Sequence, residues 1–222
     1  MNSPLASRRA AMFDMDHTVL RIDSSMSWMR FLRRRGELSR SFVAKALLWS
    51  FQYKLALLDL DSMADRIVAN LRGDLESEMI EKSAVWHERD LAGQVAPAAL
   101  EAISRHRRRG DVLVLLTGSG QYAARSVAGM LGFDHVLSTE LEVREGRFTG
   151  KLSQRCFGSH KVEVAERWAS DHGIDLATAV FYSDSYNDLP MLSRIGQPVA
   201  VNPDIRLRRH AERHGWTIER WF

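Results

Sequence analysis

The sequence predicts an α/β protein with a doubly wound, mostly parallel sheet and a mostly helical cap inserted after the first strand. Short apolar runs rich in Val, Leu and Phe alternate with helical patterns, and such runs are typical of buried parallel strands. The stretch 24–95 breaks this alternation, because it has helical periodicity and no convincing strand. A chain of 222 residues has room for one α/β domain with an insertion, whereas two independent domains would be cramped. We therefore expect a core domain of residues 1–22 and 96–222, and a cap domain of residues 23–95.

The first half of the chain contains the first strand, the cap and one core helix. The apolar run 10–13 predicts a strand at about 10–14. Pro97 begins the core helix in a position that proline favours, and Gly110 closes it after the basic run 107–109, which suits the negative end of the helix dipole. Within the cap, helical spacing of apolar residues is found at 26–32, 42–60, 67–71 and 79–91.

The second half of the chain continues the alternation of strands and helices. The apolar run 112–116 predicts the second strand, and a helical pattern at 121–131 follows it. Alternation over 141–151 around Glu145-Gly146 predicts a hairpin. Ser159 can cap the next helix and Gly173 can close it. The remaining elements are a strand at 179–182, a helix at 189–195, a strand at 198–201 and a last helix from Asp204.

Charge and cysteine content narrow the class of protein. The formal net charge is only +3, and the basic residues gather in short local runs without a known nucleic-acid-binding module, so we expect no nucleic-acid partner. The single cysteine, Cys156, cannot form an internal disulfide, which suits a reducing compartment. The first ten residues lack the apolar core of a signal peptide. A cytoplasmic protein is therefore expected.

Three of the predicted strands are followed directly by polar motifs. In an open α/β sheet, ligands bind outside the carboxyl ends of the strands, so we expect these motifs to converge on one crevice. The motifs are Asp14-Met15-Asp16-His17-Thr18, Thr117-Gly118-Ser119 and Ser183-Asp184-Ser185-Tyr186-Asn187-Asp188.

The first motif has the carboxylates that phosphoryl transfer through a covalent intermediate requires. One carboxylate, Asp14 or Asp16, can be the oxygen nucleophile, while the other protonates the leaving oxygen and later activates water. Mg²⁺ is the natural counter-ion, because it binds few carboxylates and keeps waters and a phosphate oxygen among its ligands. Taken alone, an Asp-x-Asp pair is more often a turn.

The second motif and a lysine can bind an anion. The hydroxyl of Thr117 and the backbone N–H groups near a helix N-terminus form an anion site, and Gly118 lets the backbone approach closely. The alternative is that Ser119 simply caps the following helix. Lys161 lies in the first turn of its helix, where the dipole disfavours a cation, so an adjacent anion would explain its position better than solvent alone.

The third motif contains a candidate metal ligand and a candidate hydrogen-bond donor to phosphate. Asp184 ends a buried strand, where a metal ligand is needed, and Asn187 can donate to a phosphate oxygen. We expect Asp188 to cap the helix that contains Pro190 and also to support Lys161 or the metal ligands.

Together these motifs resemble the haloacid dehalogenase superfamily of phosphohydrolases, whose pattern is a strand ending Asp-x-Asp-x-Thr, a Ser/Thr motif, a Lys and a final acidic motif. Asp16 argues against the dehalogenase branch, where that carboxylate is absent. The position of the cap and the segment 183–189, which is similar to Gly-Asp-x-x-Asn-Asp-Ile, resemble the phosphoserine-phosphatase-like subfamily IB. The resemblance implies a Rossmann-like core with a C1-type cap and a Mg²⁺-dependent phosphomonoester hydrolase that forms an aspartyl-phosphate.

The resemblance also assigns roles to residues. It makes Asp14 the nucleophile and Asp16 the general acid/base. Asp14, the backbone carbonyl of Asp16 and Asp184 would hold Mg²⁺, and Asp23 falls where phosphoserine phosphatases carry a Glu that binds the substrate amine. The residues that would bind phosphate are Thr117, Gly118, Lys161 and Asn187.

Three positions depart from the phosphoserine phosphatases. His17 replaces a small residue, Ser119 belongs to a Thr-Gly-Ser motif where Ser-Gly-Gly is common, and Asp23 is shorter than Glu. These departures weaken phosphoserine as the substrate without affecting the chemistry.

The substrate is the least readable property of the sequence. We expect a small phosphorylated metabolite such as phosphoserine or histidinol phosphate. The apolar segment 42–60 approaches the length of a membrane span, but Lys45, Lys54 and Gln52 make insertion costly, so a buried cap helix is favoured over an interfacial helix of a lipid-phosphate phosphatase. A non-catalytic phosphate-binding module and a phosphotransferase are the further alternatives, and the intact set of motif residues argues against the former.

Overall fold

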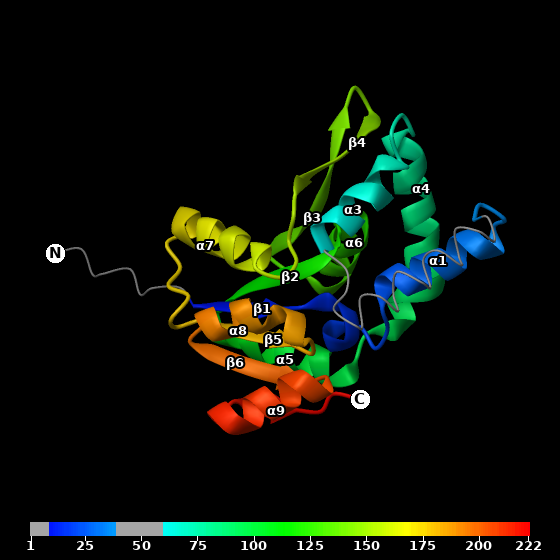
Figure 1. The fold of residues 1–222 in the computed structure, drawn as a ribbon. Coiled ribbons are helices and arrows are strands. Elements are labelled where there is room, and N and C mark those ends of the chain that lie inside the picture. The colour runs from blue at the N-terminus through cyan, green and yellow to red at the C-terminus, as the bar shows by residue number, and fades with distance from the viewer. Residues whose placement is uncertain (1–8, 39–59) are drawn as a thin grey trace.

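The computed structural model describes residues 9–38 and 60–222, and over these residues the protein has the predicted doubly wound α/β fold (Figure 1). The described strands form one seven-stranded sheet in the order β4-β3-β2-β1-β5-β6-β7. Its pairs are parallel except for β3 and β4, which form an antiparallel hairpin. The strands are β1 Ala10–Phe13, β2 Val112–Gly120, β3 His135–Arg144, β4 Arg147–Gln154, β5 Val180–Ser183, β6 Gln197–Val201 and β7 Thr217–Glu219.

Helices cover both faces of this sheet. Alternate residues of β1 point to opposite faces, so Ala11 and Phe13 belong to one buried core and Ala10 and Met12 to the other. Residues of α5 and α6 complete the first core, and residues of α7, α8 and α9 complete the second. The core helices are α5 Pro97–Arg109, α6 Gln121–Leu131, α7 His160–His172, α8 Leu189–Arg194 and α9 Ile205–His214.

The insertion contains α1 Ser24–Arg34, α3 Leu60–Ala69 and α4 Glu76–Trp86. The chain leaves and re-enters the core at one place, because Leu20 and Val95 are bridge partners and Ala96 N–H donates to the Val19 carbonyl at 2.9 Å. A second attachment joins the turn before α4 to the hairpin, where Gly73 N–H donates to the Phe148 carbonyl at 2.9 Å. Figure 1 accordingly shows α3 beside β4.

The predicted elements agree with the structure where apolar runs marked them. Two strand segments were missed: the first part of β3, where Leu137 pairs with Leu116 of β2, and the short strand β7. Both border a strand that is already paired, and neither has the long apolar run of a central strand. The division into domains at 22–23 and 95–96 stays a prediction.

The cap segment 42–60 lies outside the described residues except for Leu60, which begins α3. Among the helices of the described chain, none has the length and apolar character needed to cross a membrane.

Candidate active site

The loop after β1 brings both aspartates of the first motif to the same edge of the sheet. Asp14 N–H donates to the Tyr182 carbonyl at 2.9 Å, which continues the parallel pairing of β1 with β5 for one more residue. The chain then enters an irregular π-helical turn, Met15–Val19, in which Asp16 has extended angles and His17 has a positive φ of 53°. This turn ends the alternation of the strand, so the two side chains need not face opposite sides.

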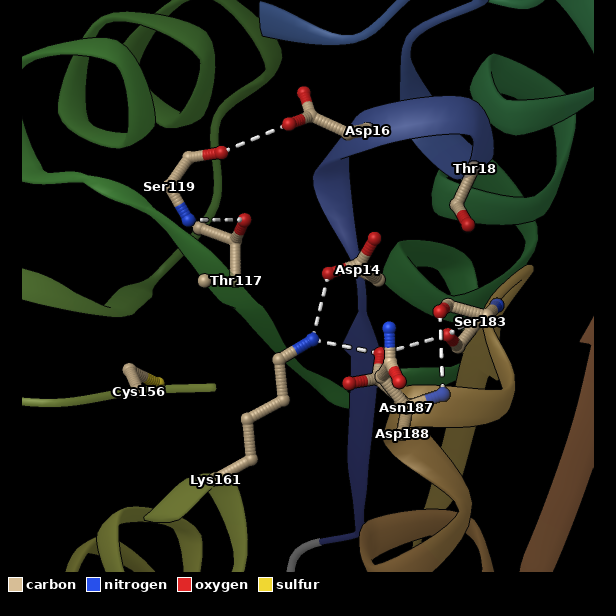
Figure 2. Close-up of polar contacts among 12 residues, drawn as sticks. Asp14, Asp16, Thr18, Thr117, Ser119, Cys156, Lys161, Ser183, Asn187 and Asp188 are labelled. Carbon is tan, nitrogen blue, oxygen red and sulfur yellow. Dashed lines mark hydrogen bonds and ion pairs between the residues drawn. The ribbon is translucent and has the colours of Figure 1, made fainter. Parts of the chain in front are cut away.

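Asp14 and Asp188 share the ammonium group of Lys161. Lys161 Nζ donates to Asp14 Oδ1 and to Asp188 Oδ2, both at 2.7 Å, and its side chain is only 3% exposed (Figure 2). Burial lowers the pKa of Lys161, but the two carboxylates outweigh that effect and raise it. Ser183 Oγ also donates to Asp188 Oδ2 at 2.7 Å. A solvated lysine is therefore excluded, and the ammonium remains charged at neutral pH.

The expected helix cap by Asp188 is not formed. Asp188 precedes α8, but its carboxylate makes no hydrogen bond to the first turn of that helix. Its Oδ2 instead accepts from Lys161 and Ser183, so the support of Lys161 is the part of the prediction that the structure shows.

The negative charges of two carboxylates at this edge, Asp14 and Asp184, are only partly balanced by positive charge. Burial raises the pKa of Asp14 to about 7 in spite of Lys161, and burial raises that of Asp184 to about 9, with Asp14 and Asp188 adding to the rise. The Thr18 hydroxyl lies 3.5 Å from Asp184 Oδ1, a long hydrogen bond. The site thus has more negative charge than Lys161 can balance.

This excess charge fits a divalent cation. The available donors are oxygens, which are the ligands that Mg²⁺ prefers. No three His, Cys, Asp or Glu side chains of the described residues are close enough together to hold a metal by themselves. Mg²⁺ suits such a site, because it normally completes its shell with waters and phosphate oxygens. The carboxylates of Asp14 and Asp184 are donors of this kind, and the assignment of Asp14, Asp184 and the backbone carbonyl of Asp16 as Mg²⁺ ligands stays a prediction.

The carboxylate of Asp16 is held by two serines. Its Oδ1 accepts from Ser24 N–H at 3.0 Å, and its Oδ2 accepts from the hydroxyls of Ser24 and Ser119, both at 2.9 Å. The two hydroxyl oxygens are 3.0 Å apart. Burial raises the pKa of Asp16 to about 6, the negative charge of Asp23 adds to the rise, and the serines oppose it. These contacts agree with the prediction that Asp16 would hold a metal through its backbone carbonyl and not through its carboxylate.

Hydrogen counting shows that the serines suit both protonation states of Asp16. When Asp16 is ionised, each hydroxyl can donate its one hydrogen to Oδ2. When Oδ2 of Asp16 holds a proton, this oxygen and the two serine hydroxyl oxygens have one hydrogen each. Each of the three can then donate to the next, which forms a closed ring of hydrogen bonds.

The Thr-Gly-Ser motif lies in the last part of β2. Thr117 is buried, and its Oγ1 accepts from Ser119 N–H at 3.1 Å. A Cβ at Gly118 would lie 3.4 Å from the Phe157 Cβ, an ordinary van der Waals contact, so the packing against the loop before α7 does not by itself require a glycine. The capping alternative for Ser119 is wrong, because Gly120 is the residue before α6 and Ser119 Oγ faces Asp16.

Asp23 and Asn187 lie at the margins of the site. Asp23 is the N-cap of α1, where its Oδ1 accepts from Met26 N–H at 2.7 Å, and it is close enough to raise the pKa of Asp16. Asn187 is exposed in the short turn before α8, and its backbone N–H donates to Ser185 Oγ at 3.2 Å.

Sequence reasoning did not assign a site role to Ser24, Ser119 or Ser183. Ser119 entered only as a possible helix cap and as a departure from Ser-Gly-Gly, and Ser24 only as the first residue of the helical stretch 24–95. Figure 2 shows Ser119 and Thr117 on one side of Asp14 and Asp16, and Ser183, Asn187 and Asp188 on another.

Comparison with known proteins gives one family and several similar proteins. The family model described as haloacid dehalogenase-like hydrolase matches residues 11–193. A phosphoserine phosphatase of Mycobacterium tuberculosis (strain ATCC 25618 / H37Rv) is 31% identical over 222 residues, which covers 97% of this chain and 71% of that protein. A histidinol-phosphatase of Neisseria meningitidis serogroup C (strain 8013) is 26% identical over 217 residues, which covers 95% of this chain and 98% of that protein. A crystal structure of a protein of unknown function from Bordetella pertussis Tohama I has a TM-score of 0.88 at 28% identity. The match covers 98% of this chain and 100% of that chain.

Proposed function

The chain is a phosphatase that belongs to the haloacid dehalogenase-like hydrolase family, in its phosphoserine-phosphatase-like branch, and from this premise we propose a specific reaction. In this proposal the protein hydrolyses the phosphate monoester of a small metabolite with the help of Mg²⁺, and the phosphoryl group is carried transiently on Asp14 as an aspartyl-phosphate. The observation that supports this most directly is the pair of aspartates two residues apart, one on a buried lysine and the other between two hydroxyls.

In the proposed first step, Asp14 attacks phosphorus and the ester oxygen leaves. Lys161 holds Oδ1 of Asp14 and so orients the carboxylate for attack by its other oxygen. Lys161 also opposes the negative charge of the phosphoryl group, and Asp188 keeps its ammonium in place. Mg²⁺, when bound, supplies further positive charge that neutralises the phosphate.

Asp16 acts in both steps of this proposal. It gives its proton to the leaving oxygen, and then takes a proton from the water that hydrolyses the aspartyl-phosphate. A pKa of about 6 suits both tasks, because a useful fraction of each form exists near neutral pH. Thr117, Gly118 and Asn187 remain the proposed partners of the phosphate oxygens.

The proposed substrate is an amine-bearing metabolite such as phosphoserine or histidinol phosphate. Similar proteins carry the names of enzymes for these two compounds. The charge of Asp23 lies near the carboxylate of Asp16 and would favour a cationic leaving group. A cytoplasmic location is part of the same proposal, since Cys156 is a free, buried thiol that suits a reducing compartment.

The test is phosphate release from phosphoserine, histidinol phosphate and 4-nitrophenyl phosphate, with Mg²⁺ and with EDTA. Asp14→Asn keeps the volume of the side chain but removes the nucleophile, so turnover should fall by about 10³-fold or more. Asp171→Asn is the matched control, because Asp171 is exposed on α7 and should leave turnover unchanged. Near-normal activity of Asp14→Asn with an unchanged melting temperature would overturn the assignment of the nucleophile.

A further inference from the structure

The carboxylate of Asp16 is held from two elements that are far apart in the chain. Ser24 begins the insertion helix α1, and Ser119 lies at the end of core strand β2. Together they direct one backbone N–H and two hydroxyls at the carboxylate, at 2.9 to 3.0 Å.

Both serines are themselves fixed. Ser24 is 2% exposed and Ser119 is 9% exposed. The backbone of Ser119 is held by its N–H bond to Thr117 Oγ1, and Ser24 lies in a helical turn that Asp23 caps. Hydrogen-bond donors on rigid, buried supports restrict a carboxylate to one rotamer far better than mobile surface groups do.

Folding alone does not account for this arrangement. Ser119 does not cap α6, and a partly buried carboxylate is a cost to stability unless a cation balances it. Three hydrogen bonds reduce that cost without placing a positive charge beside Asp16, unlike Asp14, which has Lys161.

We propose that Ser119, together with Ser24, is a positioning residue that holds the Asp16 carboxylate where it can protonate the leaving oxygen of the substrate. This inference rests on the proposed function. It assigns a task to the serine that distinguishes this chain's second motif from Ser-Gly-Gly. It also makes the placement of the acid/base depend on the insertion, because Ser24 belongs to α1.

The consequence depends on the leaving group. Without the Ser119 hydroxyl, Asp16 can leave its productive rotamer, and proton donation becomes less effective. An ester whose leaving oxygen is weakly basic needs little proton donation, whereas one with a strongly basic leaving oxygen needs it fully. The loss of rate should therefore grow with the basicity of the leaving group.

The experiment measures kcat/KM for a series of substituted phenyl phosphates from 4-nitrophenyl to phenyl phosphate, with saturating Mg²⁺. Ser119→Ala should lie within about twofold of wild type on 4-nitrophenyl phosphate and about tenfold below it on phenyl phosphate, the effect of losing one charge-assisted hydrogen bond. Ser119→Thr keeps a hydroxyl and should restore most of the loss.

Two further variants make the result specific. Ser138→Ala is the matched control, since Ser138 is a buried serine of the neighbouring strand β3 whose hydroxyl donates to Glu140 at 2.7 Å, and it should match wild type on every ester. Ser24→Ala keeps the backbone N–H to Asp16 and should show the same trend as Ser119→Ala. If thermal unfolding shows that Ser119→Ala does not fold, Ser24→Ala tests the positioning role in its place.

Other outcomes separate this inference from the proposed function. If Ser119→Ala and Ser24→Ala lose the same factor in kcat/KM on every ester, or lose nothing, the positioning role is overturned. The proposed function still stands in that case, provided that the wild type hydrolyses the esters with Mg²⁺. No Mg²⁺-dependent release from any ester by the wild type would overturn the proposed function, and the inference with it.

Discussion

Asp14 and Asp16 are two positions apart in the chain and lie in different surroundings. Asp14 accepts from an ammonium group, whereas the described polar contacts of Asp16 come from a backbone N–H and two hydroxyls. Both carboxylates are nevertheless raised in pKa, because burial is the largest influence on each. These different partners support the proposed division of roles, with Asp14 as nucleophile and Asp16 as acid/base.

The acid/base role of Asp16 predicts a pH profile for kcat/KM. Asp16 must be protonated to donate, and its pKa is about 6, so the rate on phenyl phosphate should fall as pH rises through about 6 when saturating Mg²⁺ keeps Asp14 ionised. Asp16→Asn should lose this alkaline limb and be slower by about 10²–10⁴-fold. Rates from about pH 5 to pH 8 with saturating Mg²⁺ measure both effects. The same limb in Asp16→Asn would assign it to another group.

The residue types of the site could be predicted from the sequence, but several of their contacts could not. Asp-x-Asp, Lys161 and Asp184 were identifiable because each follows a strand or opens a helix in a known motif. The hydroxyls of Ser24 and Ser119 were not, since a serine beside a helix start is normally a cap. Only the fold shows that both face one carboxylate.

At the scale of elements, prediction succeeded where a segment's own sequence decides its structure. The helix at Pro97 and the hairpin at Glu145-Gly146 carry local signals, and both are present. The strand β7 has no such signal, because its residues become extended by pairing with β6. The exact end of β2 was also missed, since the polar residues up to Gly120 continue the strand beyond its apolar run.

Two glycines of the described elements predict opposite effects of alanine. A Cβ at Gly196 would lie 1.7 Å from the Ala177 carbonyl oxygen, so Gly196→Ala should lower the free energy of unfolding by about 3 kcal/mol or more. Gly129 is exposed within α6 and a Cβ there would meet nothing within 4 Å, so Gly129→Ala should raise it by about 0.5–1 kcal/mol.

Urea denaturation of both variants beside wild type checks this pair. A stable Gly196→Ala would mean that the turn between α8 and β6 can move away from Ala177. A destabilised Gly129→Ala would mean that α6 gains nothing from a better helix former at this position.

For the whole molecule, the sheet order decides where the chemistry lies. β1 is central, between β2 and β5, so the motifs after these three strands must meet at one edge. This convergence was predictable from the order of motifs and from general rules for parallel sheets. The surroundings that select a substrate were not, because they depend on how the insertion packs over that edge.

The concentration of carboxylates predicts how metal-free stability depends on pH. The ordinary pKa of 3.8 is raised to about 7 for Asp14, about 6 for Asp16 and about 9 for Asp184. Between the ordinary and raised values the folded chain keeps protons that the unfolded chain has released. The free energy of unfolding should therefore fall as pH rises from about 4 to about 9.

Melting temperatures in EDTA at about pH 5 and pH 8 measure this dependence. Mg²⁺ should raise the melting temperature most at pH 8, and Asp184→Asn should raise it there without metal while reducing the response to Mg²⁺. A melting temperature in EDTA that is higher at pH 8 than at pH 5 would contradict the prediction.

The bridge between Leu20 and Val95 bears on how proteins of this kind acquire new specificities. Because the chain departs and returns at adjacent backbone positions, a foreign segment with matching ends can be spliced there without disturbing the register of β1 and β2. A transplant of this sort would exchange the insertion, which is expected to select the substrate, and leave Asp14, the proposed nucleophile, where it is. It would also remove Ser24, so a successful graft must bring its own donor to the carboxylate of Asp16.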